Sequence, residues 1–233
     1  MKIGIIECGP VPEALRETYV SYPTMFAAQL ALLLPFASFD TISVVNGVAL
    51  PAPDAMDAWL LTGSRHGVYD DLPWIAPLKA FIRRTAEAKR PMVGVCFGHQ
   101  ILAEALGGKV EKAAIGWRVG MEQYTTTLNG GTLGDTGQVV AMPAFHQDQV
   151  VVKPPGSEVV AHSAACPHAA LRYADAPILS VQFHPEFSRP YLADLIDVLA
   201  KQDAEPGLPP EAETGDTGMR WLAGFLADSF ARA

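Results

Sequence analysis

The 233-residue sequence is poor in cysteine and in positive charge. Its three cysteines, Cys8, Cys96 and Cys166, include no Cys-x-x-Cys pair, which argues against a disulfide framework and favours a reducing compartment. Lysine and arginine total 17 against 25 acidic residues, and the formal net charge is −8. Because nucleic-acid binding usually needs a basic patch, this composition does not favour such a partner.

The sequence also lacks a long apolar run. The longest one, near residues 25–36, contains Gln29 and Pro35 and is too short to cross a bilayer. The apolar start at residues 1–7 is too short and too soon interrupted for a signal peptide. We therefore expect a soluble, cytoplasmic protein without a membrane partner. The hydrophobic fraction of 49% is sufficient for a sizeable core.

Signatures of common cofactor sites are absent as well. There is no His-Glu-x-x-His, and no close pairing of cysteine with histidine that would indicate zinc. The glycine-rich stretches at residues 129–131 and 134–137 do not stand between a strand and a helix, as a nucleotide-binding loop would. We interpret them as surface turns and expect no cofactor.

The first half of the chain alternates between apolar strands and helices. Residues 3–6, 37–46 and 58–62 read as strands, and residues 22–34 form a helix that Pro35 stops. Asp70 to Trp74 predicts the start of a second helix, with an acidic cap and an early proline, running to about Lys89. This alternation predicts an α/β fold with a mostly parallel sheet between two helical layers.

The rest of the chain reads differently. Short strands are expected at residues 109–112, 117–128, 139–142, 150–152, 157–162, 169–173 and 178–182, followed by a helix at 190–200. Residues 203–218 are rich in Pro, Gly, Asp and Glu and predict a loop or linker. Residues 219–230 form an amphipathic helix. We expect one domain over 1–200, with 201–233 as a loop and a helix packed on it; a helix docking on a partner is the alternative.

The stretch from Met92 to Ala103 has the pattern of a nucleophile elbow. A short β-branched run ends at Cys96, which has Gly94 and Gly98 two positions away on either side, and an apolar-periodic helix follows. A nucleophile in such a sharp turn has a strained backbone, and side chains at its ±2 positions would collide. A buried structural cysteine is the alternative interpretation. In parallel sheets, functional sites gather at the carboxyl ends of strands, where Cys8, Gly63 and Cys96 all fall.

A cysteine nucleophile needs a general base and a group that orients the base. Among six histidines, His184 is distinctive because it ends an apolar run and is followed by Pro185 and Glu186. In an extended segment residues i and i+2 share a side, so Glu186 can hold the His184 imidazole. An ordinary strand-end histidine with a solvated glutamate is one alternative. Zinc ligation by Cys96, His184 and Glu186 is another.

Two motifs carry a family resemblance: Gly94 to Gln100, and Gln182 to Glu186. Together they resemble the class I (triad) glutamine amidotransferase family, over residues 1–200. The segment Phe145 to Val150 resembles part of GMP synthase glutaminase domains. Residues 61–64, 69–74 and 115–117 are similar to stand-alone GMP-synthase-like amidotransferases and γ-glutamyl peptidases. The resemblance implies a flavodoxin-like three-layer fold with a small β region, and makes residues 1–200 the catalytic domain.

The resemblance also implies roles for individual residues. Cys96 would attack a γ-glutamyl amide, His184 would move the proton, and Glu186 would orient His184. Backbone N–H groups of Phe97 and of the Gly63-Ser64 loop would form the oxyanion hole. Substrate contacts are expected from five residues: Gln100, Phe145, His146, Gln147 and Asp148. Arg65 and His66 are further candidates for binding substrate carboxylates. The implied chemistry needs neither a metal nor a cofactor.

Two departures from the family pattern bear on specificity. Gly63-Ser64-Arg65 stands where Gly-Gly-Pro is common, and Phe145 stands where a polar residue is usual. No Ser-Gly-Gly-x-Asp-Ser loop follows, so we expect that the chain does not make GMP by itself. Three hypotheses remain: a hydrolase of glutamine or another γ-glutamyl amide, an ammonia-donating glutaminase subunit of a separate synthase, and a non-catalytic binding module.

Overall fold

The fold is that of a computed structural model, which describes residues 1–127, 136–200 and 216–231. The expected turn at residues 129–131 and most of the 203–218 loop therefore lie outside the described residues. The helices are α1 (Arg16–Tyr19), α2 (Tyr22–Leu33), α3 (Ile75–Glu87), α4 (Phe97–Ala105), α5 (Arg189–Ala200) and α6 (Thr217–Ala231).

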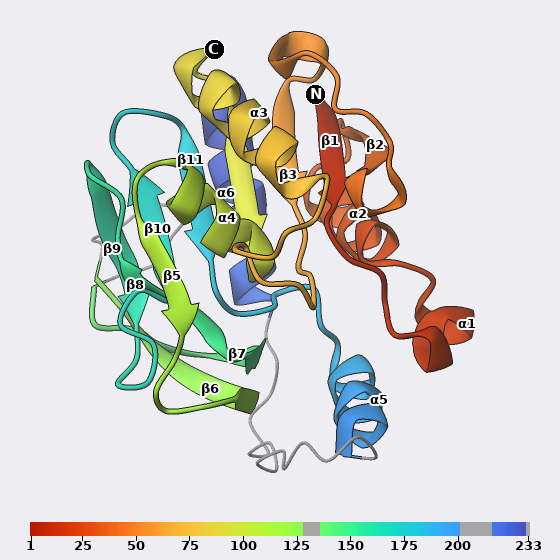
Figure 1. The fold of residues 1–233 in the computed structure, drawn as a ribbon, viewed down its shortest axis with the longest axis vertical. Helices are drawn as coiled ribbons and strands as arrows, with labels where there is room; N and C mark the ends of the chain where they lie inside the picture. The colour runs from red at the N-terminus through yellow and green to blue at the C-terminus, as the bar shows by residue number, and fades with distance from the viewer. Residues whose placement is uncertain (128–135, 201–215, 232–233) are drawn as a thin grey trace.

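A nine-stranded sheet runs through the molecule in the order β2-β1-β3-β4-β11-β10-β9-β6-β7 (Figure 1). Its strands are β1 (Lys2–Glu7), β2 (Ser38–Ser43), β3 (Ala58–Leu61), β4 (Met92–Val95), β6 (Arg118–Thr126), β7 (Val139–His146), β9 (Ser157–His162), β10 (Ala170–Tyr173) and β11 (Ile178–Val181). A separate two-stranded ladder joins β5 (Lys109–Lys112) to β8 (Asp148–Val152). Most of the β-rich middle thus extends the central sheet.

The sheet changes character at β11. The five strands from β2 to β11 are all paired in parallel, whereas β11, β10, β9, β6 and β7 are paired antiparallel. The parallel part is the α/β fold that the alternation predicts. Both parts meet where β11 lies beside β4, so the elbow strand and the strand before His184 are neighbours.

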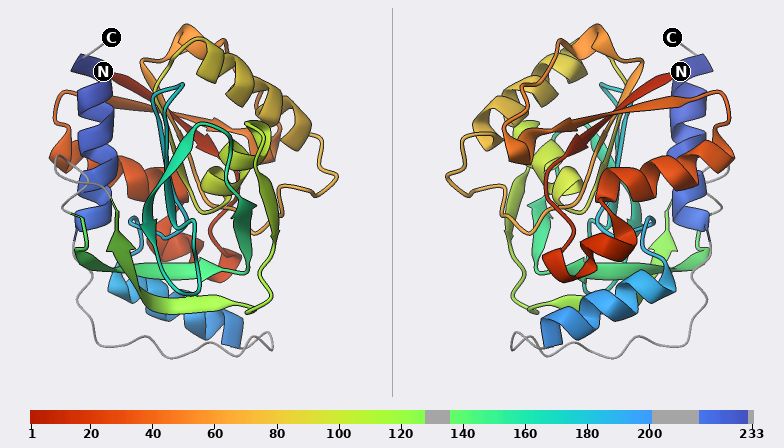
Figure 2. Two further views of the ribbon diagram at one scale, coloured as in Figure 1. Left: turned by 90° about the vertical axis from the view of Figure 1, so that its left-hand side faces the viewer. Right: turned by 90° about the vertical axis from the view of Figure 1, so that its right-hand side faces the viewer.

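Helices cover both faces of the parallel strands (Figures 1 and 2), and each face has its own core. One core packs α2 and α6 against one set of strand side chains, including Ile5 and Val95. The other packs α3 and α4 against the opposite set, including Ile6 and Leu61. Side chains alternate between the two faces of a strand, which explains why the central strands β3 and β4 have no polar side chain and are buried throughout. Helix α6 is thus part of the same core as β4.

The predicted start of the second helix is wrong. Helix α3 begins at Ile75, and no side chain caps it, although the sequence predicts a start with an acidic cap near Asp70. The reason is local. The Asp70 carboxylate accepts a hydrogen bond from the Gly67 N–H at 3.0 Å, so it stabilises the loop before the helix and does not cap α3. Helix α2 does have a polar cap, because Ser21 Oγ accepts the Thr24 N–H at 3.2 Å.

No helix among the described residues is both long and apolar enough to cross a membrane.

Candidate active site

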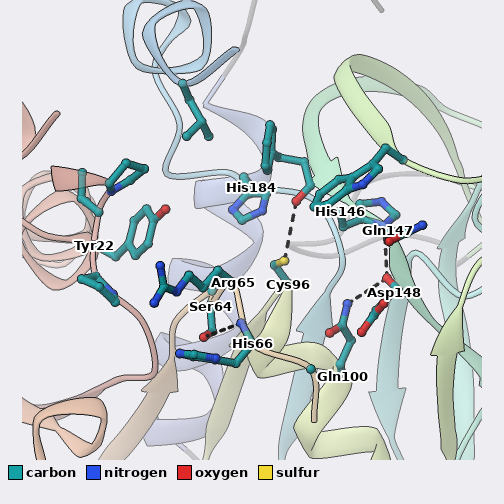
Figure 3. A pocket seen from close by; sticks show the side chains of 18 of the residues that line it. Tyr22, Ser64, Arg65, His66, Cys96, Gln100, His146, Gln147, Asp148 and His184 are labelled. Atoms are coloured by element: carbon teal, nitrogen blue, oxygen red, sulfur yellow. Dashed lines mark hydrogen bonds between the residues drawn. The ribbon is translucent and has the colours of Figure 1, made fainter. Parts of the chain in front are cut away.

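A cavity of about 650 Å³ lies at the carboxyl ends of the parallel strands. It is lined by Gly63 after β3, Cys96 after β4 and His184 after β11, and by the segment from Phe145 to Asp148. In Figure 3, Ser64, Arg65 and His66 lie on one side of Cys96, and His146, Gln147 and Asp148 lie on the other. The convergence expected from the parallel sheet is found for Gly63 and Cys96. Cys8 is fully buried and lies outside the cavity lining.

Cys96 occupies a strained turn between β4 and α4. Its φ of 53° and ψ of −107° lie in a region that non-glycine residues seldom adopt. It is the residue directly before the first helical residue, Phe97, so its sulfur lies near the positive end of the helix dipole. The local geometry is that of a nucleophile elbow.

The two glycines around Cys96 are required by close backbone contacts. A side-chain carbon on Gly94 would lie 2.6 Å from the Gly98 carbonyl carbon. One on Gly98 would overlap the Leu61 carbonyl oxygen of β3. The expected collision between the ±2 positions is therefore correct for Gly94. For Gly98 the closest obstacle is the neighbouring strand, which sequence spacing alone does not reveal.

His184 and Glu186 form a buried pair opposite Cys96. His184 Nδ1 lies 2.9 Å from Glu186 Oε1, and both side chains are almost fully buried. This bond leaves His184 Nε2 without a hydrogen-bond partner among the described residues, and Figure 3 shows the imidazole beside the Cys96 sulfur. The spacing that predicted a shared face for His184 and Glu186 gives the expected contact.

Opposing effects act on the His184 imidazole. Burial lowers its pKa, but negative charge on Cys96 and on Glu186, together with the hydrogen bond to Glu186, outweighs burial and raises the pKa to about 10. The protonated ring is therefore favoured when Cys96 is charged. Such a pair can move a proton between sulfur and a bound group.

Two residues that support this site were missed at the sequence level. The Phe187 ring stacks on His184, with ring centroids 4.0 Å apart and an interplanar angle of 11°. Gln182 Oε1 accepts a hydrogen bond from Gln100 Nε2 at 3.1 Å. Gln182 had a usable signal, since a polar residue interrupts an apolar strand run. Phe187 had none, because its contact depends on the turn after His184.

The Gly63-Ser64 loop lies against the proposed nucleophile and base. A side-chain carbon on Gly63 would lie 3.2 Å from His184 Cε1 and 3.7 Å from Cys96 Cβ. Thr62 Oγ1 donates to the Gly63 carbonyl at 3.1 Å and accepts the Cys8 N–H at 3.0 Å. Since C=O and N–H of a trans peptide point in opposite directions, this bond fixes the direction of the Ser64 N–H. Phe97, at the first helical position, has no intrahelical acceptor for its N–H.

The opposite wall consists of Gln100 and the segment from Phe145 to Asp148. The Phe145 carbonyl oxygen lies 4.0 Å from Cys96 Sγ. Gln100 Nε2 donates to the Asp148 carbonyl at 2.9 Å as well as to Gln182, so its amide hydrogens are both occupied. The Asp148 carboxylate accepts the Tyr69 hydroxyl at 2.7 Å. The atom of Gln100 left for a ligand is its amide oxygen.

His146 is buried in this wall, with Nδ1 3.3 Å from the Asp148 carbonyl oxygen. Burial, assisted by the nearby His184 charge, lowers the pKa of His146 to about 3. A neutral His146 beside a protonated His184 avoids two adjacent positive charges. His146 therefore remains a neutral hydrogen-bonding group at neutral pH.

Within the described part of the chain, no group of three His, Cys, Asp or Glu side chains is arranged to hold a metal ion. Burial raises the pKa of the Cys166 thiol to about 12 and also raises the pKa of Cys8. Both behave as unreactive core residues.

The family model described as "Glutamine amidotransferase class-I" matches residues 30–191. The chain belongs to the class-I glutamine amidotransferase family. Relatives include γ-glutamyl peptidase 3 of Arabidopsis thaliana, 27% identical over 79% of this chain and 76% of that protein. The glutamine-hydrolysing GMP synthase subunit of Methanopyrus kandleri is 36% identical over 48% of this chain and 60% of that protein.

Solved structures of this family share the fold. A glutamine amidotransferase from Thermotoga maritima superimposes with a TM-score of 0.78 over 99% of this chain and 98% of that one, at 19% identity. One from Methylobacillus flagellatus gives a TM-score of 0.76 at the same identity, over 99% and 94% of the two chains. These confirm the α/β fold class expected from the sequence.

Proposed function

We propose that this class-I glutamine amidotransferase hydrolyses the side-chain amide of glutamine, or another γ-glutamyl amide bond, through a γ-glutamyl thioester on Cys96. The observation that carries the proposal is the strained Cys96 at the start of α4, facing a buried His184 that Glu186 holds at 2.9 Å. Cys96 acts as nucleophile, His184 as general base and then acid, and Glu186 as the orienting group.

In the first step the Cys96 sulfur attacks the amide carbon, and a carbon–sulfur bond forms as the carbonyl oxygen becomes an oxyanion. The N–H groups of Phe97 and of the Gly63-Ser64 loop stabilise that charge; one such donor is worth about a hundred- to a thousand-fold in rate. The carbon–nitrogen bond then breaks, and the nitrogen leaves with the proton that His184 took from the thiol.

In the second step His184 accepts a proton from water, whose oxygen attacks the thioester carbon. The carbon–sulfur bond breaks, the proton on His184 returns to the sulfur, and the γ-carboxyl group of glutamate is released and gives its remaining proton to solvent. Gln100 presents its amide oxygen to the α-ammonium group of the glutamyl half. Arg65 and His66 bind its carboxylate; both residues line the cavity, which supports this role. Phe145, His146, Gln147 and Asp148 also line the cavity and contact the substrate.

The test is turnover by the purified full chain. We expect it to hydrolyse glutamine or a γ-glutamyl peptide, and to be labelled by a thiol-alkylating glutamine analogue. Cys96→Ala abolishes both, while the matched variants Cys8→Ala and Cys166→Ala retain labelling, because those thiols lie in the core. Equal labelling of wild-type and Cys96→Ala protein, or no turnover of either substrate by folded protein under any condition tested, contradicts the proposal.

A second candidate is an ammonia-donating glutaminase subunit that works with a separate synthase. The similarity to the Methanopyrus kandleri GMP synthase subunit favours it. Turnover by the chain alone supports an independent hydrolase; turnover only after addition of a synthase supports the ammonia-donating role. A binding module without catalysis, the third hypothesis, predicts no labelling of Cys96.

A further inference from the structure

The cavity has two walls of different chemistry. Polar groups on one side include Ser64, Arg65 and His66. Five apolar residues also line the cavity, and we call them the apolar wall: Trp117, Phe145, Phe187, Leu195 and Val198. Phe187 and Leu195 belong to one apolar cluster against which Phe145 and Val198 pack, and Trp117 contacts Phe145. A zwitterionic glutamyl head group belongs with the polar side, because burying charge against apolar surface is costly.

We propose that the apolar wall is a subsite for an aromatic or large apolar group on the leaving half of the substrate. The preferred substrates are then γ-glutamyl amides of amines or amino acids that carry such a group. This inference rests on the proposed function, which defines the two halves of the substrate.

The chemistry of the reaction places the leaving half beside the wall. The leaving nitrogen takes its proton from His184, so it lies next to the imidazole. Phe187, a member of the wall, stacks on that imidazole at 4.0 Å. Phe145, another member, has its carbonyl oxygen 4.0 Å from the Cys96 sulfur. A group attached to the leaving nitrogen therefore has aromatic rings within reach.

Trp117 extends the wall outward. Its ring centroid lies 5.6 Å from that of Phe145 at an interplanar angle of 53°, while 52% of the residue is exposed. Phe145 also packs against the apolar cluster formed by α5, which includes Leu195. An exposed tryptophan backed by a second ring is the kind of anchor that contributes strongly to binding. An aromatic ring of the ligand that packs on Trp117 would cover its exposed surface.

The size of the cavity agrees with a substrate larger than glutamine. About 650 Å³ is within the range of pockets that hold drug-sized ligands. The leaving group of free glutamine is ammonia, which is too small to contact the apolar wall.

The first test measures binding to the Cys96→Ala full chain, so that turnover does not interfere. By calorimetry, γ-glutamyl-phenylalanine should bind about tenfold more tightly than γ-glutamyl-alanine, and Trp117→Ala or Phe145→Ala on this background should remove most of that ratio. Trp117→Phe should keep most of it. The control Leu32→Ala, on α2 and outside the cavity lining with 83% of Leu32 exposed, should not change the ratio.

Equal affinities for the two ligands, or a ratio that survives both Trp117→Ala and Phe145→Ala, overturns the subsite. The same ratio in kcat/KM for the protein with Cys96 intact separates the two proposals. Hydrolysis of both peptides at equal kcat/KM refutes the subsite alone. A binding preference for the phenylalanine ligand without any turnover supports the subsite and refutes the proposed reaction.

Discussion

Glu186 is a buried acidic residue that contacts the His184 imidazole. Only 1% of it is exposed, and its Oε1 is bound to His184 Nδ1. A carboxylate in such a place is costly unless it is paired. Its backbone carbonyl also accepts a hydrogen bond from Gln29 Nε2 at 2.8 Å, which ties the turn after β11 to α2. Both the side chain and the main chain of Glu186 thus hold the His184 ring in place.

Glu186→Gln tests this role. The substitution keeps the shape but removes a charge that helps to raise the pKa of His184, so the pKa falls and the protonated ring is lost at a lower pH. We expect kcat/KM to drop by about a hundred- to ten-thousand-fold, with the melting temperature nearly retained. Glu158→Gln, in an exposed ion pair with Arg172, is the control. Activity within twofold of wild type would assign Glu186 a structural role only.

At the scale of elements, the elbow depends on how closely α4 approaches β3. Leu102 and Ile101 of α4 belong to the core shared with α3, so the helix cannot easily move away from the sheet. The close contact of Gly98 with the Leu61 carbonyl makes this approach possible.

Gly98→Ala should therefore destabilise the protein by about 1–3 kcal/mol, as overpacking of a core does, and should reduce labelling of Cys96. Urea unfolding and the labelling rate measure the two effects. Gly47→Ala is the comparison variant. Gly47 has a φ of 81°, and a Cβ atom added there would have no neighbour within 4 Å. Alanine at this position therefore strains the backbone but causes no steric clash. Equal labelling rates in the two variants would show that Gly98 does not position the elbow.

At the scale of the whole molecule, two buried histidines make the stability of the fold depend on pH. His99 of α4 is fully buried, and its Nδ1 lies 2.8 Å from Ser180 Oγ of β11. Burial, with the nearby histidines His146 and His168, lowers the pKa of His99 to about 3. His146 of β7 has a similarly lowered pKa. Between pH 3 and pH 6.5, therefore, both side chains are neutral in the folded protein but protonated in the unfolded chain.

This predicts a specific loss of stability in acid. Below the ordinary histidine pKa of about 6.5 the unfolded state gains protons that the folded state does not, so stability falls as pH falls. Between pH 7 and pH 5 each of His99 and His146 should cost about 2 kcal/mol. Between pH 7 and pH 5 the free energy of unfolding of His99→Gln, measured by urea unfolding, should fall by about 2 kcal/mol less than that of the wild type. Above pH 7 the difference in free energy of unfolding between the two proteins should be constant. Parallel curves from pH 7 to 5 would contradict the prediction.

The sequence by itself determines the local features of this protein. The alternation of apolar strands with helices predicts the parallel sheet, because strands that helices cover on both faces consist mainly of apolar residues. Glycine spacing predicts the elbow, and His-x-Glu spacing predicts the 2.9 Å pair, because backbone geometry alone fixes which neighbours share a face. The catalytic roles, the oxyanion donors and the division at residue 200 remain predictions.

Only the tertiary structure decides which distant residues meet. It places β11 beside β4 and so brings His184 to Cys96, and it adds β9, β6 and β7 to the same sheet. It sets Gln182 against Gln100, Phe187 against His184, and Trp117 against Phe145. Asp70 binds its own loop and does not cap α3. Local pattern follows from backbone period and sterics, whereas these contacts follow from the packing of elements far apart in the chain.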